Sequence, residues 1–459
     1  MNKSDTICAI STPAGMGAIA LVRISGTQAF SIVEQFIKMD TPFSEVPPQM
    51  AKFSEFREDE VVIDQVVVTK FVHPYSYTGE DLAEISCHGS PYIQKRILES
   101  LIEKGARMAN PGEFTMRAFL NGKLDLPQAE AVSDLIESQS ETSHKLAVKQ
   151  LKGDFSNTIK ELHTQFLNFA SLLELELDFS EEDVQFADRK QLNELLINIK
   201  KEVQSLLQSF KLGNVLKHGI PVAIIGKPNV GKSTLMNALV ADDRAIVSST
   251  PGTTRDTIED IYNIQGITFR FIDTAGIRVS DDEIENFGIE RTYKAIEKAD
   301  IILYMIDVVE TSLQDIQNEL VFIENEIDLS DKKLIIIANK IDQLSEMPHH
   351  STEWEEYDVV YTSARRRVNI NHIADLLADY VSSKKINDAT LLTNTRHYDV
   401  MMNIGKSIEK IEEGFAAQLP TDLISIEVRN ALHFLGLATG TISTDDLLEN
   451  IFGKFCIGK

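Results

Sequence analysis

The fold of the central part of this chain is decided by one stretch, Gly226-Lys227-Pro228-Asn229-Val230-Gly231-Lys232-Ser233-Thr234. It fits the pattern G-x-x-x-x-G-K-[ST] of a phosphate-binding loop, for which the alternative is a plain glycine turn. The apolar residues 222–225 predict a buried strand before it, and residues 234–240 predict a helix after it. The motif requires this context, because backbone N–H groups at a helix N-terminus hold an anion. We expect Lys232 to reach the β- and γ-phosphates and the Ser233 hydroxyl to bind Mg²⁺.

The length and composition limit the number of domains and the classes of protein to which this chain can belong. A chain of 459 residues, 43% of them hydrophobic, has room for about three domains with their own cores. Its cysteines, Cys8, Cys87 and Cys456, are too few and too far apart for a disulfide framework or a zinc site. No run of about 18 apolar residues occurs, so neither export nor membrane spanning is predicted. We expect a protein of the reducing cytoplasm.

The charge balance restricts the binding partners. With 70 acidic and 45 basic residues, the net charge is −25. Broad electrostatic binding to nucleic acid is disfavoured, because its affinity comes largely from neutralising phosphates. The acidity has a simpler explanation in solubility. A role on RNA would therefore need a local basic patch or a basic partner.

The first 120 residues have mixed α+β character. Residues 19–24 and 66–72 predict strands, and residues 28–38 and 92–104 predict helices. Charged groups then gather among glycines and apolar residues in 76–84, 111–114 and 117–125. This mixture suits a small polar ligand in a partly apolar pocket. Turn chemistry with surface charge is the alternative that the residues alone leave open.

Two long helical segments flank the phosphate-binding loop. Apolar residues recur at spacings of three and four between 126 and 210, and again from 383 to the end. No proline interrupts the chain between Pro127 and Pro221, and Gly213 with Lys217-His218-Gly219 is predicted to close the first segment. Because each half needs a cover for its apolar face, we expect one all-α domain with another domain inserted. The predicted domains are 1–120, 121–215, 216–382 and 383–459, the second and fourth forming the helical domain.

The inserted domain alternates strand and helix patterns, as in a doubly wound α/β sheet. A hairpin is predicted over 258–272 with its turn at Gln265-Gly266. The further predicted elements are strands at 301–306, 334–338 and 359–361 and a helix at 370–381.

Four short motifs follow the phosphate-binding loop in order: Gly252-Thr253-Thr254-Arg255-Asp256, Asp273-Thr274-Ala275-Gly276, Asn339-Lys340-Ile341-Asp342 and Ser363-Ala364-Arg365. The first offers a threonine hydroxyl to Mg²⁺. The second offers a carboxylate to the Mg²⁺ shell and an N–H to the γ-phosphate. The Asp342 carboxylate can accept both N1–H and the amino group of guanine, and an N–H of the last motif can meet guanine O6. Each motif alone could be a turn or a helix cap, but together they predict a GTPase.

One position departs from the common small GTPases. Ile277 follows Asp273-Thr274-Ala275-Gly276, where those proteins carry a water-positioning glutamine. Water must be oriented from elsewhere, and the acids Glu283, Glu285 and Glu290 are candidates. They could equally be acids that favour a helix N-terminus.

Taken together, these stretches resemble the tRNA-modification GTPases of the MnmE (TrmE) family, over essentially the whole chain. The resemblance also rests on segments outside the G domain, which are Thr12-Pro13 to Gly26, Tyr77 to Asp81, Pro111 to Phe114, Arg117 to Asp125 and Phe455-Cys456-Ile457-Gly458-Lys459. The last is the most specific, since GTPases in general lack it.

The resemblance implies an N-terminal domain that dimerises and binds 5-formyl-tetrahydrofolate, a helical domain and an inserted Ras-like G domain. It implies a homodimer that forms a heterotetramer with an FAD-containing partner, MnmG, without a membrane. The pair would install aminomethyl or carboxymethylaminomethyl groups at C5 of the wobble uridine of certain tRNAs.

By motif position, the resemblance assigns site residues. The folate contacts fall on Arg23, Glu84, Lys123 and Lys459. Potassium falls on Asn229, Ser248, Thr250 and Thr253, magnesium falls on Ser233 and Thr254, and the water-orienting acid on Glu285. The positions implied to bind GTP are Asn229, Val230, Gly231, Lys232, Ser233, Thr234, Ser248, Ser249, Thr250, Pro251, Gly252, Thr253, Thr254, Asp273, Thr274, Ala275, Gly276, Asn339, Lys340, Asp342, Ser363, Ala364 and Arg365. Lys227 stands where many relatives have Arg.

The C-terminal segment carries the last expectation. Phe452, Phe455 and Ile457 surround Cys456, so we expect the tail to pack down and bring Lys459 to the folate site, where Cys456 takes part in one-carbon chemistry. The rival functions are a ribosome-assembly or stress-signalling GTPase and a folate enzyme with a regulatory G domain.

Overall fold

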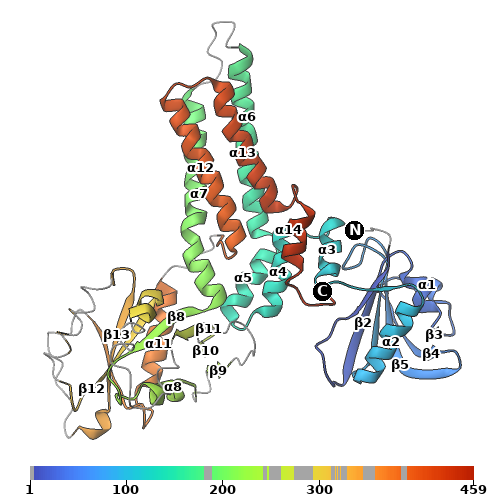
Figure 1. Cartoon of the computed structure of the whole chain (residues 1–459), viewed down its shortest axis with the longest axis horizontal. Coiled ribbons are helices and arrows are strands. Elements are labelled where there is room, and N and C mark those ends of the chain that lie inside the picture. The colour runs from blue at the N-terminus through green and yellow to red at the C-terminus, as the bar shows by residue number, and fades with distance from the viewer. Residues whose placement is uncertain are drawn as a thin grey trace. The chain divides into compact units, whose positions relative to one another are not determined.

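The structure is a computed structural model that describes residues 5–179, 189–240, 245–247, 260–272, 293–311, 328–344, 357–383 and 390–459, and the single positions 316, 318 and 321. It divides into two compact units (Figure 1). The first unit comprises Met1–Ile136, Lys149–Val203 and Asp399–Lys459, and the second comprises Glu137–Val148 and Gln204–Tyr398.

The first unit contains a sheet with the strand order β3-β4-β5-β6-β2-β1-β7. Its strands are β1 (Ile7–Ile10), β2 (Ile19–Ser25), β3 (Ile37–Lys38), β4 (Ala51–Glu58), β5 (Val61–Phe71), β6 (Leu82–His88) and β7 (Arg107–Met108). Neighbours are antiparallel except β1 and β7, which are parallel. Alternate residues such as Val22, Ile24 and Ile85 are buried in one core with residues of α1 (Ala29–Glu34) and α2 (Pro91–Glu103). The predicted α+β character is confirmed.

One predicted element of this sheet is wrong. The apolar period over 28–38 predicts a helix, but α1 ends at Glu34, and Ile37 and Lys38 form β3. Ile37 pairs with Phe56 on β4 and Lys38 with Glu55. Pairing with a neighbouring strand therefore overrides the local helical pattern.

The helices of the first unit come from both ends of the chain. They are α3 (Glu113–Leu120), α4 (Leu126–Glu137), α6 (Asp154–Phe179), α13 (Thr421–Thr439), α14 (Asp445–Phe452) and the adjoining parts of α5 (Glu141–Leu151), α7 (Arg189–His218) and α12 (Thr395–Ala416). Helices α6 and α13 pack along each other (Figure 1), and the rings of Phe169 on α6 and Phe415 on α12 meet edge to face at 6.2 Å. Helices from the two segments thus pack against each other, as predicted.

The sequence predicts that Gly213 helps to close the first helical segment. In the structure, however, this glycine lies inside α7. A Cβ atom at this position would overlap the backbone carbonyl of Leu392. The glycine therefore permits close approach of another backbone rather than a helix end.

The second unit contains a sheet with the order β14-β13-β12-β8-β11-β10-β9. Its elements are β8 (Ile220–Ile225), α8 (Lys232–Val240), β9 (Ala245–Val247), β10 (Asp260–Ile264), β11 (Ile267–Ile272), β12 (Ile301–Asp307), β13 (Lys333–Asn339), β14 (Asp358–Tyr361) and α11 (Ile370–Ser383). The strands from β14 to β11 are parallel, and β10 and β9 add an antiparallel edge. Every residue of β12 is buried, as expected for a central strand with cores on both faces. This is the predicted α/β sheet.

Helix α5 is joined to the hairpin of this sheet. Ser140 and Ser143 cap its start, each side chain accepting a hydrogen bond from the other's backbone N–H at 3.1 Å. The carbonyl oxygen of Gly266, in the β10–β11 turn, accepts from both the N–H and the hydroxyl of Thr142 at 3.1 Å. These two hydrogen bonds fix the start of α5 against the β10–β11 turn.

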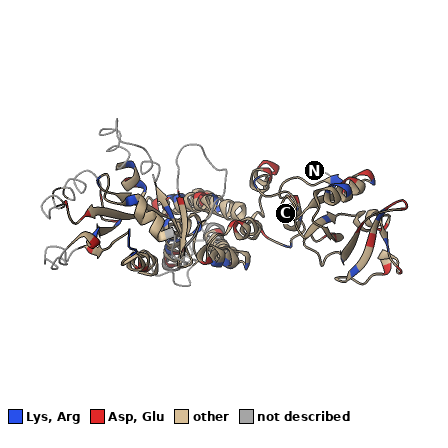
Figure 2. Cartoon of the chain, turned by 90° about the horizontal axis from the view of Figure 1, so that it is seen from below, with Lys and Arg blue, Asp and Glu red and all other residues tan. Residues whose placement is uncertain are grey.

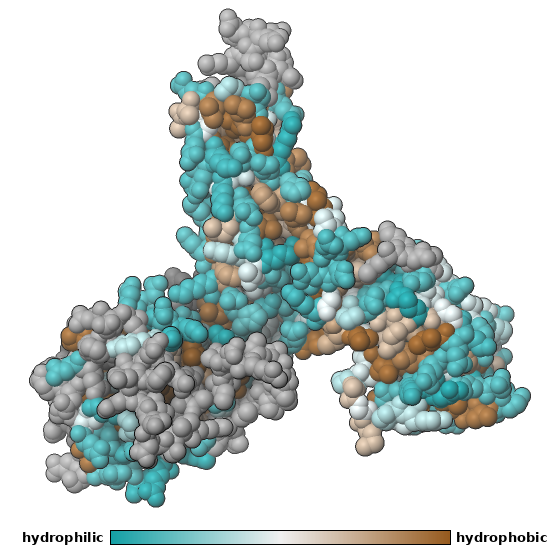
Figure 3. All heavy atoms as spheres, in the orientation of Figure 1, coloured by the Kyte–Doolittle hydropathy of each residue, from teal (hydrophilic) through white to brown (hydrophobic). Residues whose placement is uncertain are grey.

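Charged and apolar residues are distributed over the whole part of the chain that the structure describes. Figure 2 shows Lys and Arg scattered among Asp and Glu on the ribbon. Figure 3 shows apolar surface in several patches among hydrophilic residues. In the described ranges, no helix combines the length and the apolar character needed to cross a bilayer.

Candidate functional site

The phosphate-binding loop connects β8 to α8 and can be built only with glycines at two places. Gly226 has φ of +140° and Gly231 has φ of +105°. A Cβ atom on Gly226 would overlap the carbonyl oxygen of Met305 on β12, and one on Gly231 would overlap the side-chain amide of Asn339, the last residue of β13. The loop backbone is therefore pressed against the carboxyl ends of two neighbouring parallel strands, where α/β sheets bind their ligands.

Lys232, the first residue of α8, folds back over this loop. Its Nζ donates hydrogen bonds to the carbonyl oxygens of Gly226 at 2.6 Å and Lys227 at 2.9 Å. Burial lowers the pKa of this amine from its ordinary value. Ser233 and Thr234 follow as exposed residues in the first turn of the helix. A cation and a hydroxyl thus lie at one helix N-terminus, which is suited to an anion and its metal.

Asn339 connects the loop to the motifs that follow it. The residue is 3% exposed. Its Nδ2 donates to the carbonyl oxygen of Val230 at 2.7 Å, and its Oδ1 accepts from the N–H of Ala364 at 2.9 Å. One buried carboxamide therefore joins three motifs that are far apart in the sequence.

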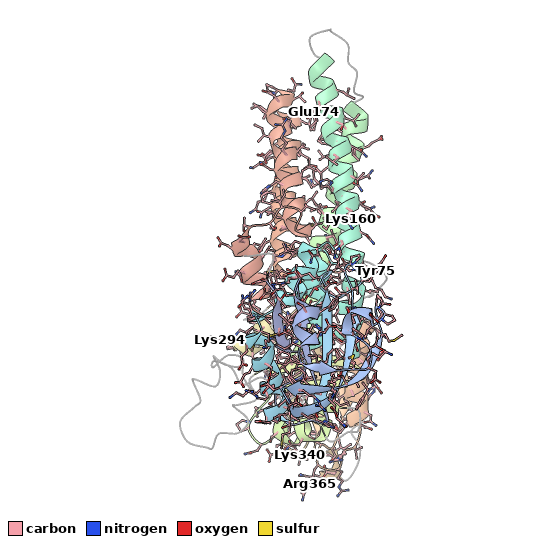
Figure 4. All side chains as sticks on the ribbon, turned by 90° about the vertical axis from the view of Figure 1, so that its right-hand side faces the viewer. Tyr75, Lys160, Glu174, Lys294, Lys340 and Arg365 are labelled. Atoms are coloured by element: carbon pink, nitrogen blue, oxygen red, sulfur yellow. The ribbon has the colours of Figure 1, made fainter. Side chains whose placement is uncertain are left out.

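The next two polar residues of this motif are held by neighbouring side chains. Lys340 has φ of +71° and forms an ion pair at 2.5 Å with the buried Asp307 at the end of β12. Asp342, in the short 3₁₀ turn Ile341–Gln343, accepts a hydrogen bond from the Ser363 hydroxyl at 2.6 Å. That bond, helped by the charge of Arg366, keeps the pKa of Asp342 below its ordinary value. Figure 4 labels Lys340 and Arg365 on the loops after β13 and β14.

The structure thus brings together Val230, Gly231, Lys232, Asn339, Asp342, Ser363 and Ala364 among the predicted GTP-binding residues. Several predicted positions lie outside the described residues, namely Ser248 to Thr254, Asp273 to Gly276 and Glu285. Among the residues that are described, no group of three or more His, Cys, Asp or Glu side chains could hold a metal ion by itself. A Mg²⁺ ion bound to one hydroxyl and the nucleotide phosphates would not require such a group.

A second candidate site lies on the sheet of the first unit. Arg23 on β2 and Glu84 on β6 are directly opposite each other, and the guanidinium donates twice to Glu84 Oε1, at 2.7 and 3.0 Å. The Arg23 guanidinium also lies 5.2 Å from the ring centre of Tyr77 and 5.6 Å from that of Phe114. The guanidinium is thus oriented by Glu84 and packed against the half-buried Tyr77 and the fully buried Phe114, and an oriented cation of this kind suits an anionic ligand.

The C-terminal tail returns to this pair. The Gly458 carbonyl oxygen accepts from Arg23 at 3.4 Å and from the Ser11 hydroxyl at 3.1 Å, and the Lys459 carbonyl oxygen accepts from the N–H of Phe114 at 3.2 Å. Gly458 has φ of +92°, and a Cβ atom there would overlap the carbonyl of Ile10. Burial lowers the pKa of the Lys459 amine, and the Arg23 charge adds to this effect.

The packing of the tail corrects one expectation. Phe452 and Phe455 are 2% and 9% exposed and pack in a core with residues of α3 and α4. Ile457, expected to be buried with them, is 50% exposed, and Cys456 is also exposed. The tail is held by backbone hydrogen bonds after Phe455, including one from the N–H of Gly112 to the Cys456 carbonyl at 3.3 Å, so these two side chains are free to point outward.

Lys123 forms no hydrogen bond or ion pair with the other three predicted folate residues, all of which the structure describes. Its Nζ donates to the carbonyl oxygen of Pro74 at 3.1 Å. Its side chain crosses Gly79, where a Cβ atom would lie 3.2 Å from Lys123 Cγ. The structure therefore groups Arg23, Glu84 and Lys459 and leaves Lys123 on the adjoining loop.

A charged network beside this site was not predicted from the sequence. Arg117, with 8% of its side chain exposed, forms ion pairs with Asp5 at 2.7 Å, Glu80 at 3.1 Å and Glu113 at 3.1 Å. Arg107 pairs with the same Glu113 at 2.6 Å, and these contacts keep the pKa of Glu113 below its ordinary value despite its burial. The spacing of four between Glu113 and Arg117 on one helix is the signal that could have revealed it. The network fixes the 76–81 loop and the start of α3 around Arg23.

Comparisons with known proteins agree with this arrangement. The "GTP-binding protein TrmE N-terminus" family matches residues 6–123, and the "MnmE helical domain" family matches residues 126–456. The chain is 47% identical to the tRNA modification GTPase MnmE of Christiangramia forsetii, over 100% of both chains. It is 47% identical to that of Cytophaga hutchinsonii, over 100% of this chain and 98% of the relative. It is 44% identical to that of Bacteroides thetaiotaomicron, over 99% of both.

Identity at this level over the full length, with the two family matches, leaves one assignment. The chain belongs to the MnmE family of tRNA modification GTPases.

Proposed function

We propose that this protein is a potassium-dependent GTPase that, with an FAD-containing partner, carries out a folate-dependent modification of the wobble uridine of tRNA. The observation that carries the proposal is the seating of the C-terminal tail on Arg23, at the Arg23–Glu84 pair. A GTPase that only switches partners has no use for such a contact, whereas a one-carbon enzyme needs a cationic, partly enclosed site.

The nucleotide roles follow from the loops around Asn339. Lys232 would neutralise the β- and γ-phosphates, and Ser233 with Thr254 would hold Mg²⁺. Asp342 would accept both donors of the guanine edge, since it is ionised and oriented by Ser363. Backbone N–H groups of Ser363 to Arg365 would face guanine O6. Residues 248–254 and 273–276, which lie outside the described residues, would supply contacts to the γ-phosphate.

The potassium proposal fits the chemistry of the residues present. Asn229 holds a left-handed backbone with φ of +62° at the outer side of the phosphate-binding loop, and its side chain offers a neutral oxygen of the kind that K⁺ binds. Ser248, Thr250 and Thr253 would add further oxygens. When bound, the ion supplies the positive charge that an arginine finger supplies elsewhere. Glu285 would orient the attacking water, because Ile277 cannot.

The residues of the first unit also fit a folate. Arg23 and Lys459 provide positive charge for its carboxylates, Glu84 accepts hydrogen bonds, and the half-buried Tyr77 offers an aromatic ring beside Arg23, whereas Phe114 is fully buried. Lys123 would join them from its adjoining loop. The bound folate supplies the one-carbon unit, and we assign to the exposed Cys456 a role in that chemistry.

The assembly is proposed by the same reasoning. Residues 1–120 would dimerise and bind folate, 121–215 and 383–459 would form the helical domain, and 216–382 would form the G domain. A homodimer would join the MnmG-type partner and tRNA in a heterotetramer in the cytoplasm.

The test is mass spectrometry of wobble uridines in tRNA from a strain lacking the protein. Complementation with the wild type should restore the aminomethyl-type groups, and Lys232→Ala should not. If the deletion strain has normal wobble uridines, the proposal is wrong and a ribosome-assembly or stress-signalling role takes its place.

A further inference from the structure

We propose that the turn 364–367, between β14 and α11, is a contact for the phosphate backbone of tRNA. This inference rests on the proposed function, because it takes tRNA as the substrate. The turn contains Arg365, Arg366 and Arg367, the only three consecutive basic residues in a chain of net charge −25. A chain so acidic repels RNA over most of its surface, so binding must rely on local concentrations of positive charge.

The turn presents its arginines on a fixed backbone. Ser363 and Val368 close it through two mutual hydrogen bonds, at 3.0 and 3.3 Å, and the Thr362 hydroxyl donates to the Val368 carbonyl at 2.6 Å. Arg367 and Asn369 both have left-handed backbones, with φ of +57° and +59°. Such conformations are unfavourable for a non-glycine residue and persist only where neighbouring groups hold them. The arginines are therefore displayed by a rigid element.

The three side chains are available for a ligand. All are exposed. Arg366 lies 3.7 Å from the Asp342 carboxylate but keeps 69% of its side chain in solvent. Among the residues that the structure describes, Arg365 and Arg367 form no side-chain hydrogen bond or ion pair. One guanidinium group can bind two oxygens of the same phosphate. Three consecutive arginines can therefore bind neighbouring phosphates along one RNA strand.

The surroundings favour RNA over a protein partner. Protein interfaces have an apolar centre, and the exposed large hydrophobic residue within the turn region is Val368 alone, at 39%. The turn also follows Asp342 and Ser363, at the guanine end of the candidate nucleotide site. RNA bound there would contact the same loop that holds the base of GTP.

The experiment measures binding of the full-length protein to an unmodified tRNA transcript between about 50 and 200 mM KCl. The triple variant R365A/R366A/R367A should bind at least about tenfold more weakly at the lower salt concentration. Its slope of log affinity against log salt should fall by about 2 to 3, the value for three lost phosphate contacts. The variant R365K/R366K/R367K should restore most of the slope, because the charge is retained.

Two further variants serve as controls. K294A/K298A removes two exposed charges from a helix of the same unit and should leave the slope unchanged. R367A should lower the slope by about 1 and leave GTP hydrolysis without RNA at the wild-type rate.

A triple alanine variant with the wild-type slope, or a wild type that binds no tRNA, would overturn the inference. A triple variant that binds tRNA normally but loses a protein partner would show that the turn is a protein interface. The wobble-uridine measurement remains a separate test of the proposed function.

Discussion

Asn339 and Val230 are joined by a hydrogen bond of 2.7 Å from the Asn339 Nδ2 to the Val230 carbonyl oxygen. The first residue belongs to the predicted guanine-binding motif and the second to the phosphate-binding loop, and 109 positions separate them. Because the same carboxamide also accepts from Ala364, the two ends of the candidate nucleotide site cannot move independently.

Asn339→Ala should destabilise the protein and weaken nucleotide binding together. The change leaves a buried carbonyl and a buried N–H without partners, at about 1–3 kcal/mol each. We expect the free energy of unfolding of the G domain, measured in urea, to fall by about 2–4 kcal/mol. Ser383→Ala, which removes an exposed hydrogen bond to the Tyr380 carbonyl on α11 of the same unit, should change it by less than about 0.5 kcal/mol. Equal effects of the two changes would contradict this role of Asn339.

Asp342→Asn should exchange guanine for xanthine specificity. The amide presents a donor where guanine also presents donors, so GTP affinity should fall more than about 100-fold while affinity for xanthosine triphosphate rises. Unchanged GTP binding in this variant would contradict the assignment of guanine specificity to Asp342.

The same carboxylate predicts a pH dependence. Its folded-state pKa is lowered from 3.8, so the charged form is present above that value and is lost only as the pH falls through the lower, folded-state pKa. GTP affinity in the wild type should therefore stay flat as the pH falls from about 7.5 to about 5, as far as Asp342 is concerned.

GTP hydrolysis should depend on potassium through Asn229. Turnover should be much faster in KCl than in NaCl of equal ionic strength, and Asn229→Ala should reduce the difference. Asn229→Gly is a second variant, because glycine tolerates the left-handed backbone and removes the side chain that carries the oxygen. Equal rates in the two salts for the wild type would rule the site out. Arg255 and Arg278, which lie outside the described residues, would then be candidates for an arginine finger.

Glu285→Ala should lower kcat and leave nucleotide affinity nearly intact. This is the pattern of a group that acts on water in the transition state. Single-turnover hydrolysis and nucleotide titration of the same preparation would measure both quantities. A large loss of affinity with kcat retained would instead indicate an acid that only stabilises a helix start.

Gly458→Ala should detach the tail and weaken folate binding. The new Cβ atom would overlap the Ile10 carbonyl, and the backbone would be strained at φ of +92°. We expect calorimetry with 5-formyl-tetrahydrofolate to show at least about a tenfold loss. GTP hydrolysis by the isolated protein should not change. Lys454→Ala, at an exposed position of the same segment, is the control.

Removal of Cys456 to Lys459 should abolish wobble-uridine modification while GTP hydrolysis stays near normal. Cys456→Ser tests chemistry apart from packing, since serine is similar in size and a far weaker nucleophile. If the truncated protein still supports modification in cells, the tail has no such role and the assignment of Lys459 fails with it.

The sequence was most informative where a local pattern and its function coincide. The phosphate-binding loop and the strands of the second unit could be predicted, because a glycine motif between a strand and a helix can adopt few alternative conformations. The end of α1 could not, since Ile37 leaves the helical pattern only to pair with Phe56. The exposure of Ile457 depends on backbone hydrogen bonds that leave no trace in hydropathy. Only the Glu113–Arg117 pair of the Arg117 network, with its spacing of four on one helix, could have been predicted, because Asp5 and Glu80 come from separate segments.

The contact between Arg23 and Gly458 spans 435 positions of sequence. Loop closure over such a distance is slow compared with the formation of local helices and hairpins. During synthesis the N-terminal sheet and the whole second unit leave the ribosome before the tail does. The candidate folate site is therefore finished last, so a newly made chain should bind guanine nucleotides before it can bind folate.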